Sequence, residues 1–262
     1  MLKLYYSGAP NPAKVALFLE EAGMPYEAIP VDTRKGEQHS PEYLKINPNA
    51  KVPAIVDGDV VVFDSSAILL YLADKTGKFL PAKTDKARGE LLSWMFFVSS
   101  GVGPYAGQSV HFRVYAPEKI PYAMNRYAFE AQRHFKILDD RLAKQPFMLG
   151  DTYTIVDMNV WGWARMVPNV LGEGAWDKFP NLKRYIDGIN ARPAAKIAGA
   201  LKDRHKFKAE MDAVYAGARV RVCTRQCVRV RDDGGAAAVP RSHVHACACV
   251  APRVLLGLDA PY

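Results

Sequence analysis

The side chains best suited to covalent or metal chemistry are confined to the end of this 262-residue chain. All four cysteines follow residue 216, and two histidines and two cysteines alternate with other residues within Ser242–Cys249. Such soft ligands could bind zinc or copper, but alternating spacing is not the usual zinc geometry and the flanking residues provide no scaffold. We therefore expect no metal site. The first 216 residues contain no cysteine, so they cannot use a protein thiol as a nucleophile.

The net charge is divided in the same uneven way. Residues 217–262 contain seven arginines, three aspartates and neither lysine nor glutamate, so they carry half of the net charge of +8. The charge alone would suggest a nucleic-acid partner, but the arginines are scattered and the only aromatic residue there, Tyr262, offers no stacking platform. We expect no nucleic-acid partner, and we expect residues 206–262 to form a poorly ordered tail.

Composition excludes several other classes of protein. Hydrophobic residues make up 49% of the chain, enough to form a core, so disorder along the whole chain is excluded. No run of 18 uncharged apolar residues exists, and the first residues lack the pattern of a secretory signal. We expect a cytoplasmic protein with no membrane contact.

The elements that must position functional residues fall into two groups. Residues 1–81 alternate strand and helix patterns in the order β-α-β-α-β-β-α, with a strand at Val52–Val56 and a helix capped by Asn11 near the start. A second helix begins at Ser65. Residues 86–205 show helical periodicity only, with breaks at Gly101–Pro104, Ala116–Pro121, Gln145–Asp151 and Gly172–Lys178. A short helix is also expected at Asp203–Ala216.

Several motifs in this arrangement resemble those of the soluble glutathione transferases. Lys51-Val52-Pro53 is similar to the strand-entry motif of that family, Asp64-Ser65 to its acidic-Ser pair, and Thr154–Asp157 to its capping box. Other stretches resemble the bacterial nu class, relatives of the fungal nitrogen-regulator group: Phe18–Glu21, Ile68–Ala73, Gly107-Gln108 and Ile120–Ala123. The resemblance covers about residues 1–205. It implies a thioredoxin-like α/β N-terminal domain at 1–81, an all-α C-terminal domain at 86–205, and a homodimer.

The resemblance implies that glutathione is bound as co-substrate at the face of the first domain. Val52, with Pro53 in the cis form, would offer its backbone N–H and C=O to the cysteinyl unit, although a trans proline at a strand start is the simpler alternative. Ser65 and the free N–H groups of its helix would hold the γ-glutamyl carboxylate, and Asp64 would pair with the amine. Ser65 could also serve only as a helix cap.

Stabilising the glutathione thiolate is assigned to the start of the first helix. Nu-class relatives place a Thr and an Asn on either side of a proline, and here the same stretch reads Ala9-Pro10-Asn11. Asn11 is therefore the expected catalytic residue and Ser7 the reserve candidate, while Asn11 as a plain helix cap remains the alternative. The missing Thr hydroxyl affects catalytic efficiency more than binding.

Three further residues follow from the resemblance. Gln38 matches a contact to the glycyl end of glutathione, Arg126 matches an arginine supplied by the partner subunit, and Lys51 is a similar, weaker candidate for glutathione binding. Without the resemblance, all three would be interpreted as solvated surface residues. A set of aromatic residues could wall the pocket for the second substrate, namely Trp94, Phe96, Phe97, Tyr105, His111 and Phe112, although aromatics at such spacing usually belong to a core.

Two functions remain open at this point. The first is an enzyme that presents glutathione thiolate to a small electrophile, or to a disulfide or peroxide that it reduces, with a second glutathione resolving the mixed disulfide. The second is a non-catalytic glutathione-binding or regulatory module on the same fold, and Ala9 in place of Thr keeps this alternative open.

Overall fold

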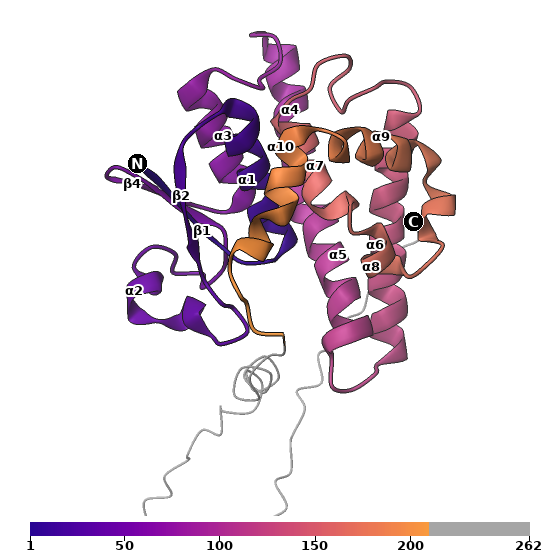
Figure 1. Cartoon of the computed structure of the whole chain (residues 1–262). Coiled ribbons are helices and arrows are strands. Elements are labelled where there is room, and N and C mark those ends of the chain that lie inside the picture. The colour runs from indigo at the N-terminus through magenta and orange to yellow at the C-terminus, as the bar shows by residue number, and fades with distance from the viewer. Residues whose placement is uncertain (210–262) are drawn as a thin grey trace, which may run out of the picture. The chain divides into compact units, whose positions relative to one another are not determined.

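The computed structural model describes residues 1–209, in which an N-terminal sheet with its helices packs beside a helical domain (Figure 1). The expected order β-α-β-α-β-β-α is confirmed. Its elements are β1 (Leu2–Tyr6), α1 (Pro10–Ala22), β2 (Tyr26–Pro30), the 3-10 turn η1 (Glu37–His39), α2 (Pro41–Leu44), β3 (Ala54–Asp57), β4 (Val60–Phe63) and α3 (Ser65–Thr76). The Cys and His motif of the tail lies outside the described residues.

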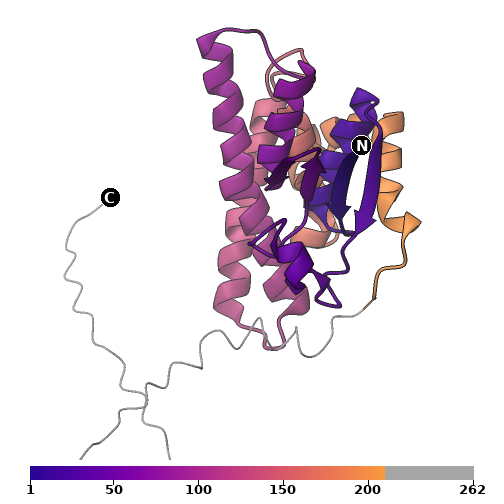
Figure 2. The ribbon, with the colours of Figure 1, turned by 90° about the vertical axis from the view of Figure 1, so that its left-hand side faces the viewer.

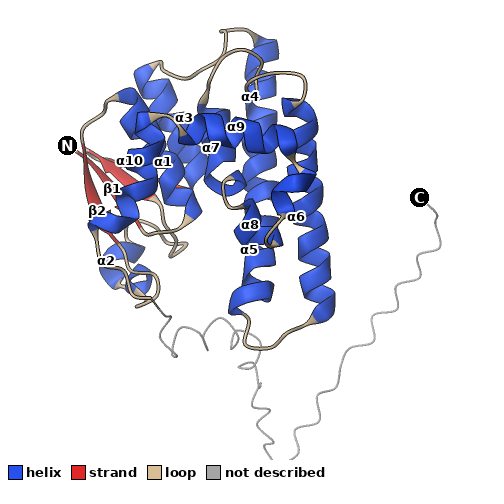
Figure 3. Cartoon of the chain, turned by 45° about the vertical axis from the view of Figure 1, so that its right-hand side comes forward, coloured by secondary structure: helices blue, strands red, loops and turns tan. Residues whose placement is uncertain are grey.

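The four strands form one mixed sheet in the order β2-β1-β3-β4 (Figure 3). β1 runs parallel to β2 and antiparallel to β3, and β3 runs antiparallel to β4. Ala54 at the start of β3 pairs with Tyr5 near the end of β1 and with Phe63 at the end of β4. The chain therefore leaves β1, enters β3 and leaves β4 at the same edge of the sheet.

Helix α1 is buried between this sheet and the helical domain, and Val15–Leu19 are inaccessible to solvent. The expected cap at Asn11 is wrong, because the helix begins at Pro10 with Ala9 as its N-cap residue. Proline suits this first position, since its ring fixes a helical φ and its missing N–H would have no partner there. The helix ends where Gly23 takes a left-handed φ of 65°.

Among the described residues, the regular elements of the second domain are all helical, apart from one isolated β-bridge between Phe147 and Gly150. They are α4 (Asp85–Phe97), the π-turn η2 (Val98–Val102), α5 (Gly103–Val110), the π-turn η3 (His111–Tyr115), α6 (Pro121–Leu142), α7 (Ile155–Ala164), α8 (Val167–Leu171), the 3-10 turn η4 (Ala175–Lys178), α9 (Pro180–Asn190), α10 (Pro193–Ala200) and the 3-10 turn η5 (Leu201–Arg204). The all-α architecture is confirmed.

The helix break expected at Gly101–Pro104 is wrong. Helices α4 and α5 form one column joined by the π-turn η2 (Figure 2). The reason is a close approach by His134 of α6, whose ring nitrogen Nε2 would lie 2.5 Å from a Cβ atom at position 101. Glycine is needed there to admit the ring, which packs against Phe97 and Tyr105 with ring centres 5.2 and 5.0 Å apart, respectively. The glycine thus marks a wide helical turn.

The expected capping box at the start of α7 is confirmed. Thr154 Oγ1 accepts a hydrogen bond from the Val156 N–H at 3.3 Å, and Asp157 Oδ2 accepts one from the Thr154 N–H at 2.7 Å. Asp157 also fixes two other parts of the domain, because its Oδ1 accepts bonds from the Met148 N–H and the Tyr185 hydroxyl, both at 2.8 Å. All of these groups are buried, so this carboxylate organises the interior of the domain.

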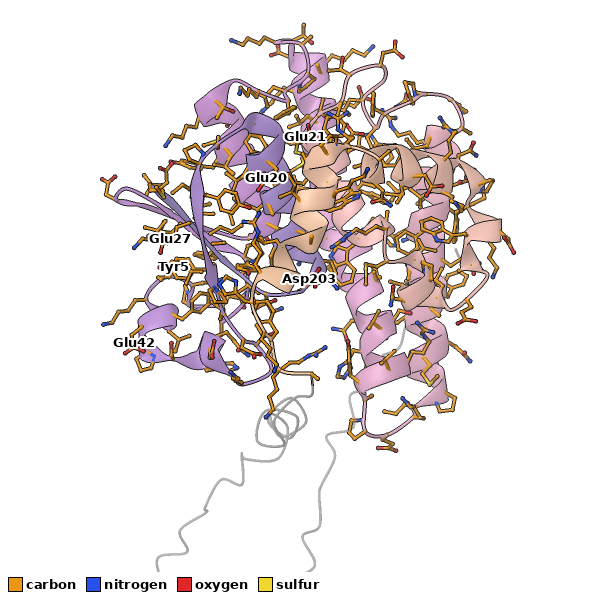
Figure 4. The ribbon with its side chains drawn as sticks, in the orientation of Figure 1. Tyr5, Glu20, Glu21, Glu27, Glu42 and Asp203 are labelled. Atoms are coloured by element: carbon orange, nitrogen blue, oxygen red, sulfur yellow. The ribbon has the colours of Figure 1, made fainter. Side chains whose placement is uncertain are left out.

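The two domains are joined by polar contacts as well as by the packing of α1 and α3 on α7. The guanidinium of Arg192 binds both carboxylate oxygens of Glu21, which is labelled in Figure 4. The Ser66 hydroxyl of α3 donates to Asn159 Oδ1 of α7 at 3.2 Å. The first contact fixes the end of α1 against the helical domain, and the second fixes the start of α3.

The chain beyond α10 returns to the first domain. Of the helix expected at Asp203–Ala216, the described part is not α-helical: η5 ends at Arg204 and no helix covers residues 205–209. The rings of His205 and Phe207 meet the Tyr6 ring edge-on, at 5.7 and 5.6 Å, and the Lys208 N–H donates to Asp32 Oδ2 at 2.8 Å. Residues 206–209, expected to belong to the tail, contact the first domain.

Candidate functional site

The candidate site lies at the sheet edge where β1 ends, β3 begins and β4 ends. Ser7 lies in the connection after β1 and Asn11 in the first turn of α1, Lys51-Val52-Pro53 precede β3, and Asp64-Ser65 follow β4. Seven of the nine predicted site residues therefore come from three segments that meet at one edge, where their polar groups can act on one ligand.

Asn11 lies in the first turn of α1, and its carboxamide is held by the other domain. Its Oδ1 accepts a hydrogen bond of 2.8 Å from the indole Nε1–H of Trp163 on α7. An indole N–H only donates, so it must face the amide oxygen, which leaves the two N–H bonds of the Asn11 amide for other partners. Because Ala9 is the cap residue, the interpretation of Asn11 as a plain helix cap is excluded.

Ser7 is buried directly after β1, and its Oγ accepts the Ala9 N–H at 3.3 Å. It lines a cavity of about 10 Å³ together with Arg165, whose Nε has no hydrogen-bond partner among the described residues. Such a cavity has room for about one water molecule. Ser7 thus stabilises the turn into α1 as an acceptor, and its O–H bond remains free to donate.

The start of α3 differs from the expectation in one respect. Asp64, rather than Ser65, is the N-cap residue: its Oδ1 accepts the N–H groups of Ser66 and Ala67 at 2.9 and 3.1 Å. Asp64 adopts a φ of 71°, in the left-handed region. The Ser65 hydroxyl is therefore not needed for capping and is available to a ligand.

Ser65 has a neighbour that the sequence interpretation missed. The ammonium of Lys14, one turn after Asn11 on α1, donates to Ser65 Oγ at 3.4 Å. Lys14 is fully buried, and burial lowers its pKa to about 7, with the Asp64 carboxylate opposing that shift. Its aliphatic stem lies against Gly162, where an added Cβ would overlap Lys14 Cγ. A lysine directly before the apolar run Val15–Leu19, three residues after Asn11, was the available signal.

The segment before β3 contributes backbone groups. The Val52–Pro53 peptide bond is cis, as the resemblance implied. The carbonyl of Lys51 accepts bonds from the Tyr43 hydroxyl at 2.7 Å and from Asn47 Nδ2 at 2.6 Å, while its side chain is exposed. Val52 precedes the first paired residue of β3, Ala54, so its backbone is outside the sheet ladder.

Gln38 is buried, not solvated, with 6% of its surface exposed. Its Nε2 donates to the Thr33 carbonyl at 3.3 Å, and its buried Oε1 has no hydrogen-bond partner within residues 1–209. Buried acceptors are rarely left unpaired, so this oxygen is suited to accept an N–H from a ligand.

Arg126 is not brought to this edge by its own chain. It lies on α6, which packs against α5, α8 and α9, and its half-exposed side chain pairs with Glu130 at 2.7 Å. Glu130 also binds Arg133 at 3.0 Å, and the two arginines lower its pKa. Two of the aromatic residues that could wall a second pocket, Phe97 and Tyr105, pack on His134 inside the helical domain, and Phe96 is 60% exposed.

A thioredoxin-like sheet domain followed by an all-α domain, with donors gathered at the edge of the sheet, defines the class of soluble glutathione transferases. The chain belongs to the glutathione S-transferase family: residues 2–74 match the N-terminal domain of glutathione S-transferases and residues 124–193 match their C-terminal domain. It is 41% identical over 208 residues to the disulfide-bond oxidoreductase YfcG of Escherichia coli, covering 74% of this chain and 92% of that protein.

Solved structures agree with this assignment. A glutathione transferase from Pseudomonas fluorescens with two glutathione molecules bound has a TM-score of 0.72 and 37% identity, covering 75% of this chain and 91% of that one. The transferase URE2P6 of Phanerochaete chrysosporium, in complex with oxidised glutathione, has a TM-score of 0.72 and 36% identity, covering 78% and 96%. The expected fold and family are therefore confirmed.

Two further observations on the described residues bear on other classes of site. No group of three or more metal-ligating side chains is found within residues 1–209. No helix in the same part of the chain is both long and apolar enough to cross a membrane.

Proposed function

We propose that this glutathione transferase binds glutathione at the edge formed by β1, β3 and β4 and holds its thiolate at the start of α1. The observation that carries the proposal is the orientation of Asn11. Its amide oxygen is occupied by Trp163, so its N–H bonds are the groups left to meet a sulfur anion. A sequence relative named as a disulfide-bond oxidoreductase, and neighbours solved with glutathione or oxidised glutathione, support this chemistry.

Each part of glutathione has a counterpart in the site. The γ-glutamyl carboxylate is assigned to the Ser65 hydroxyl, backed by the Lys14 ammonium, and the γ-glutamyl amine to Asp64. The Val52 backbone would pair with the cysteinyl unit as an added strand does. Gln38 Oε1 would accept the glycyl N–H, and Lys51 would lie near the terminal carboxylate.

The energetic requirement for the thiolate is modest. A free thiol has a pKa near 8.5, and about 2 kcal/mol of differential stabilisation makes it mostly ionised at pH 7. One hydrogen bond to a charged acceptor supplies about 1.5–3 kcal/mol, and the positive end of α1 adds to it. Asn11 is thus sufficient without the Thr hydroxyl that Ala9 lacks.

The bound thiolate would react with either of two substrate classes. With an electrophile, a carbon–sulfur bond forms and the leaving group departs with its electron pair. With a disulfide, the thiolate attacks one sulfur, the S–S bond breaks, and one half of the substrate leaves as a thiolate. A second glutathione then attacks the mixed disulfide, giving glutathione disulfide and the other substrate thiol. No protein cysteine takes part, in agreement with its absence from residues 1–216.

We expect Asn11→Ala to lower turnover of an aryl halide and of a small mixed disulfide about 10- to 100-fold at pH 7, because the thiol loses its donor. Ser7→Ala is expected to lower both rates less than threefold, since Ser7 is buried and lines a cavity with room for only about one water molecule. Steady-state kinetics with both substrates tests this. If neither substitution changes either rate, the assignment of the thiolate donor is wrong.

The alternative function, a glutathione-binding module without turnover, rests on Ala9 in place of the family Thr. Calorimetry and kinetics on the same preparation separate the two functions: glutathione binding without turnover of aryl halides, peroxides or disulfides would favour the module. A cytoplasmic location suits either function, because glutathione and free thiols are kept reduced there.

The protein is further proposed to be a homodimer. Large apolar side chains on α4, η3 and α6 are exposed in the single chain: Phe96, Val114, Tyr115, Tyr122 and Phe129 are 52–80% exposed. Aromatic residues are typical anchors of interfaces, and Arg126 lies on the same helix as Tyr122 and Phe129. The solution mass is expected to be twice 29.0 kDa, and Phe96→Glu to shift it toward the monomer in sedimentation experiments. A monomeric wild-type protein would contradict the proposal.

A further inference from the structure

The hydrogen bond between Trp163 and Asn11 joins residues 152 positions apart, one in each domain. The donor lies on α7, whose start is fixed by the capping box, and the acceptor lies in the first turn of α1. Neither group is fully exposed, so water competes weakly for the bond. The amide of the candidate thiolate donor is therefore oriented by the helical domain.

The indole itself has little freedom to turn. A Cβ atom at Gly103 would lie 3.1 Å from Trp163 Nε1, and one at Gly107 would lie 3.4 Å from Cη2. Trp163 thus packs against two glycines one turn apart on α5, a face that is open only because these residues have no side chains. This contact surface of Gly103 and Gly107, the glycine slot, keeps the Nε1–H of Trp163 directed at α1.

The orientation matters because a carboxamide has two unlike ends. If the Asn11 amide rotated by half a turn, its oxygen would face the site and repel a thiolate, while its N–H bonds would face the indole N–H. An asparagine without a fixed partner samples both arrangements. A donor-only neighbour at the oxygen selects the arrangement in which the site receives N–H bonds.

We propose that Trp163 is a positioning residue for the glutathione thiolate, acting through Asn11, and that its glycine slot on α5 is part of the same device. The proposal rests on the proposed function, in which Asn11 donates to the sulfur. It makes the helical domain responsible for the acidity of the bound thiol, while the first domain is responsible for holding glutathione. Binding and activation of glutathione are thereby assigned to different domains.

The test is Trp163→Phe, which removes the N–H and keeps an aromatic ring. We expect the pKa of bound glutathione, followed by thiolate ultraviolet absorbance, to rise, and turnover at pH 7 to fall about five- to tenfold. The dissociation constant for S-methylglutathione, which has no thiol, should stay within twofold of wild type. A rise in thiol pKa with unchanged binding is not expected from general damage to the structure.

The chain provides a matched control on the same helix. Trp161 donates its Nε1–H to Asn190 Oδ1, also at 2.8 Å, but within the helical domain. Trp161→Phe removes an equivalent indole–amide bond and should lower stability without changing the thiol pKa. In an Asn11→Ala background, Trp163→Phe should cause no further loss, because the two residues act in series.

The outcomes separate this inference from the proposed function. If Asn11→Ala raises the thiol pKa and Trp163→Phe does not, the positioning role is overturned and the proposed function stands. If wild type turns over and Asn11→Ala leaves the thiol pKa unchanged, the thiolate donor itself is wrong. Should Trp163→Phe fail to fold, Gly103→Ala replaces it: the added methyl crowds Nε1, and an unchanged thiol pKa in that variant overturns the positioning role.

Discussion

Replacing Asp157 with alanine is expected to lower the free energy of unfolding by about 3–5 kcal/mol. The carboxylate accepts bonds from two buried N–H groups and from the hydroxyls of Tyr185 and Thr154, and alanine would remove the acceptor of all four donors. Burial raises the pKa of Asp157 above its ordinary value, and the hydrogen bonds to its oxygens oppose that shift without cancelling it. Urea denaturation of the variant and of wild type measures the loss.

Asp139→Ala is the matched control for this measurement. Asp139 is also a buried aspartate of the helical domain, but it accepts a single strong backbone bond, from the Leu182 N–H at 2.9 Å. Urea denaturation should therefore show a smaller loss, about 1–3 kcal/mol, for this variant. Equal losses of unfolding free energy for the two variants would contradict the larger contribution expected of the hydrogen bonds at Asp157.

We expect Lys14→Met to raise the free energy of unfolding and to lower the affinity for the glutathione analogue. Methionine keeps the length of the stem against Gly162 and removes an ammonium that burial makes unfavourable. We expect the free energy of unfolding at pH 6 to rise by about 1–4 kcal/mol. Because the charged donor behind Ser65 is lost, affinity for S-methylglutathione should fall about 10- to 100-fold.

The effect of Lys14→Met on the free energy of unfolding should depend on pH. Lys14 has a pKa of about 7 in the folded protein against an ordinary value of 10.5, so between these values the unfolded chain binds more protons. The free energy of unfolding of wild type therefore rises with pH across this window, and the cost of the buried ammonium is fully present below it. The gain from Lys14→Met should be largest below pH 7 and disappear as the pH approaches 10.5.

Binding should also be linked to protonation of Lys14. At pH 8 the ligand-free lysine is mostly neutral, and a carboxylate at Ser65 would favour its charged form. Calorimetry with S-methylglutathione in buffers of different ionisation enthalpy should show proton uptake in wild type and less in Lys14→Met. Lys78→Met, which removes an exposed ammonium bound to the carbonyl of Ala22 at the other end of α1, should bind as wild type does. Identical proton uptake in all three proteins would contradict the role of Lys14.

Much of the fold followed from local patterns. The turn residues and alternating strands of the first domain, and the Thr154–Asp157 box, are encoded within a few residues, and the structure has them where they were expected. The errors arose where distant residues decide the outcome. Gly101 resembles a helix breaker in the sequence, but its lack of a side chain admits the His134 ring, and this contact depends on α6.

The candidate site shows the same division. Asn11, Asp64 and Ser65 could be named from motifs, and the sheet register brings their segments to one edge. The residues that orient these side chains could not be predicted. Trp163 is far from Asn11 in the sequence, and Lys14 resembles a solvent-facing lysine in the sequence because its burial depends on the helical domain. Local sequence indicates which residues meet a ligand, and long-range packing determines how they are oriented.

The π-turn between α4 and α5 has a consequence for how the site could change in evolution. A π-turn contains one residue more than an α-helical turn, and each residue advances an α-helix by about 100°. The π-turn accommodates this extra residue within one wide turn, so deleting one residue from Val98–Val102 would restore a regular helix and leave Gly103 and Gly107 at nearly the same angular position against Trp163. Deleting one residue between Gly103 and Gly107 would instead rotate Gly107 by about 100° relative to Gly103, so that the two glycines no longer face the indole together. The π-turn is therefore the place on the α4–α5 column where a one-residue change in length keeps the indole connected to Asn11.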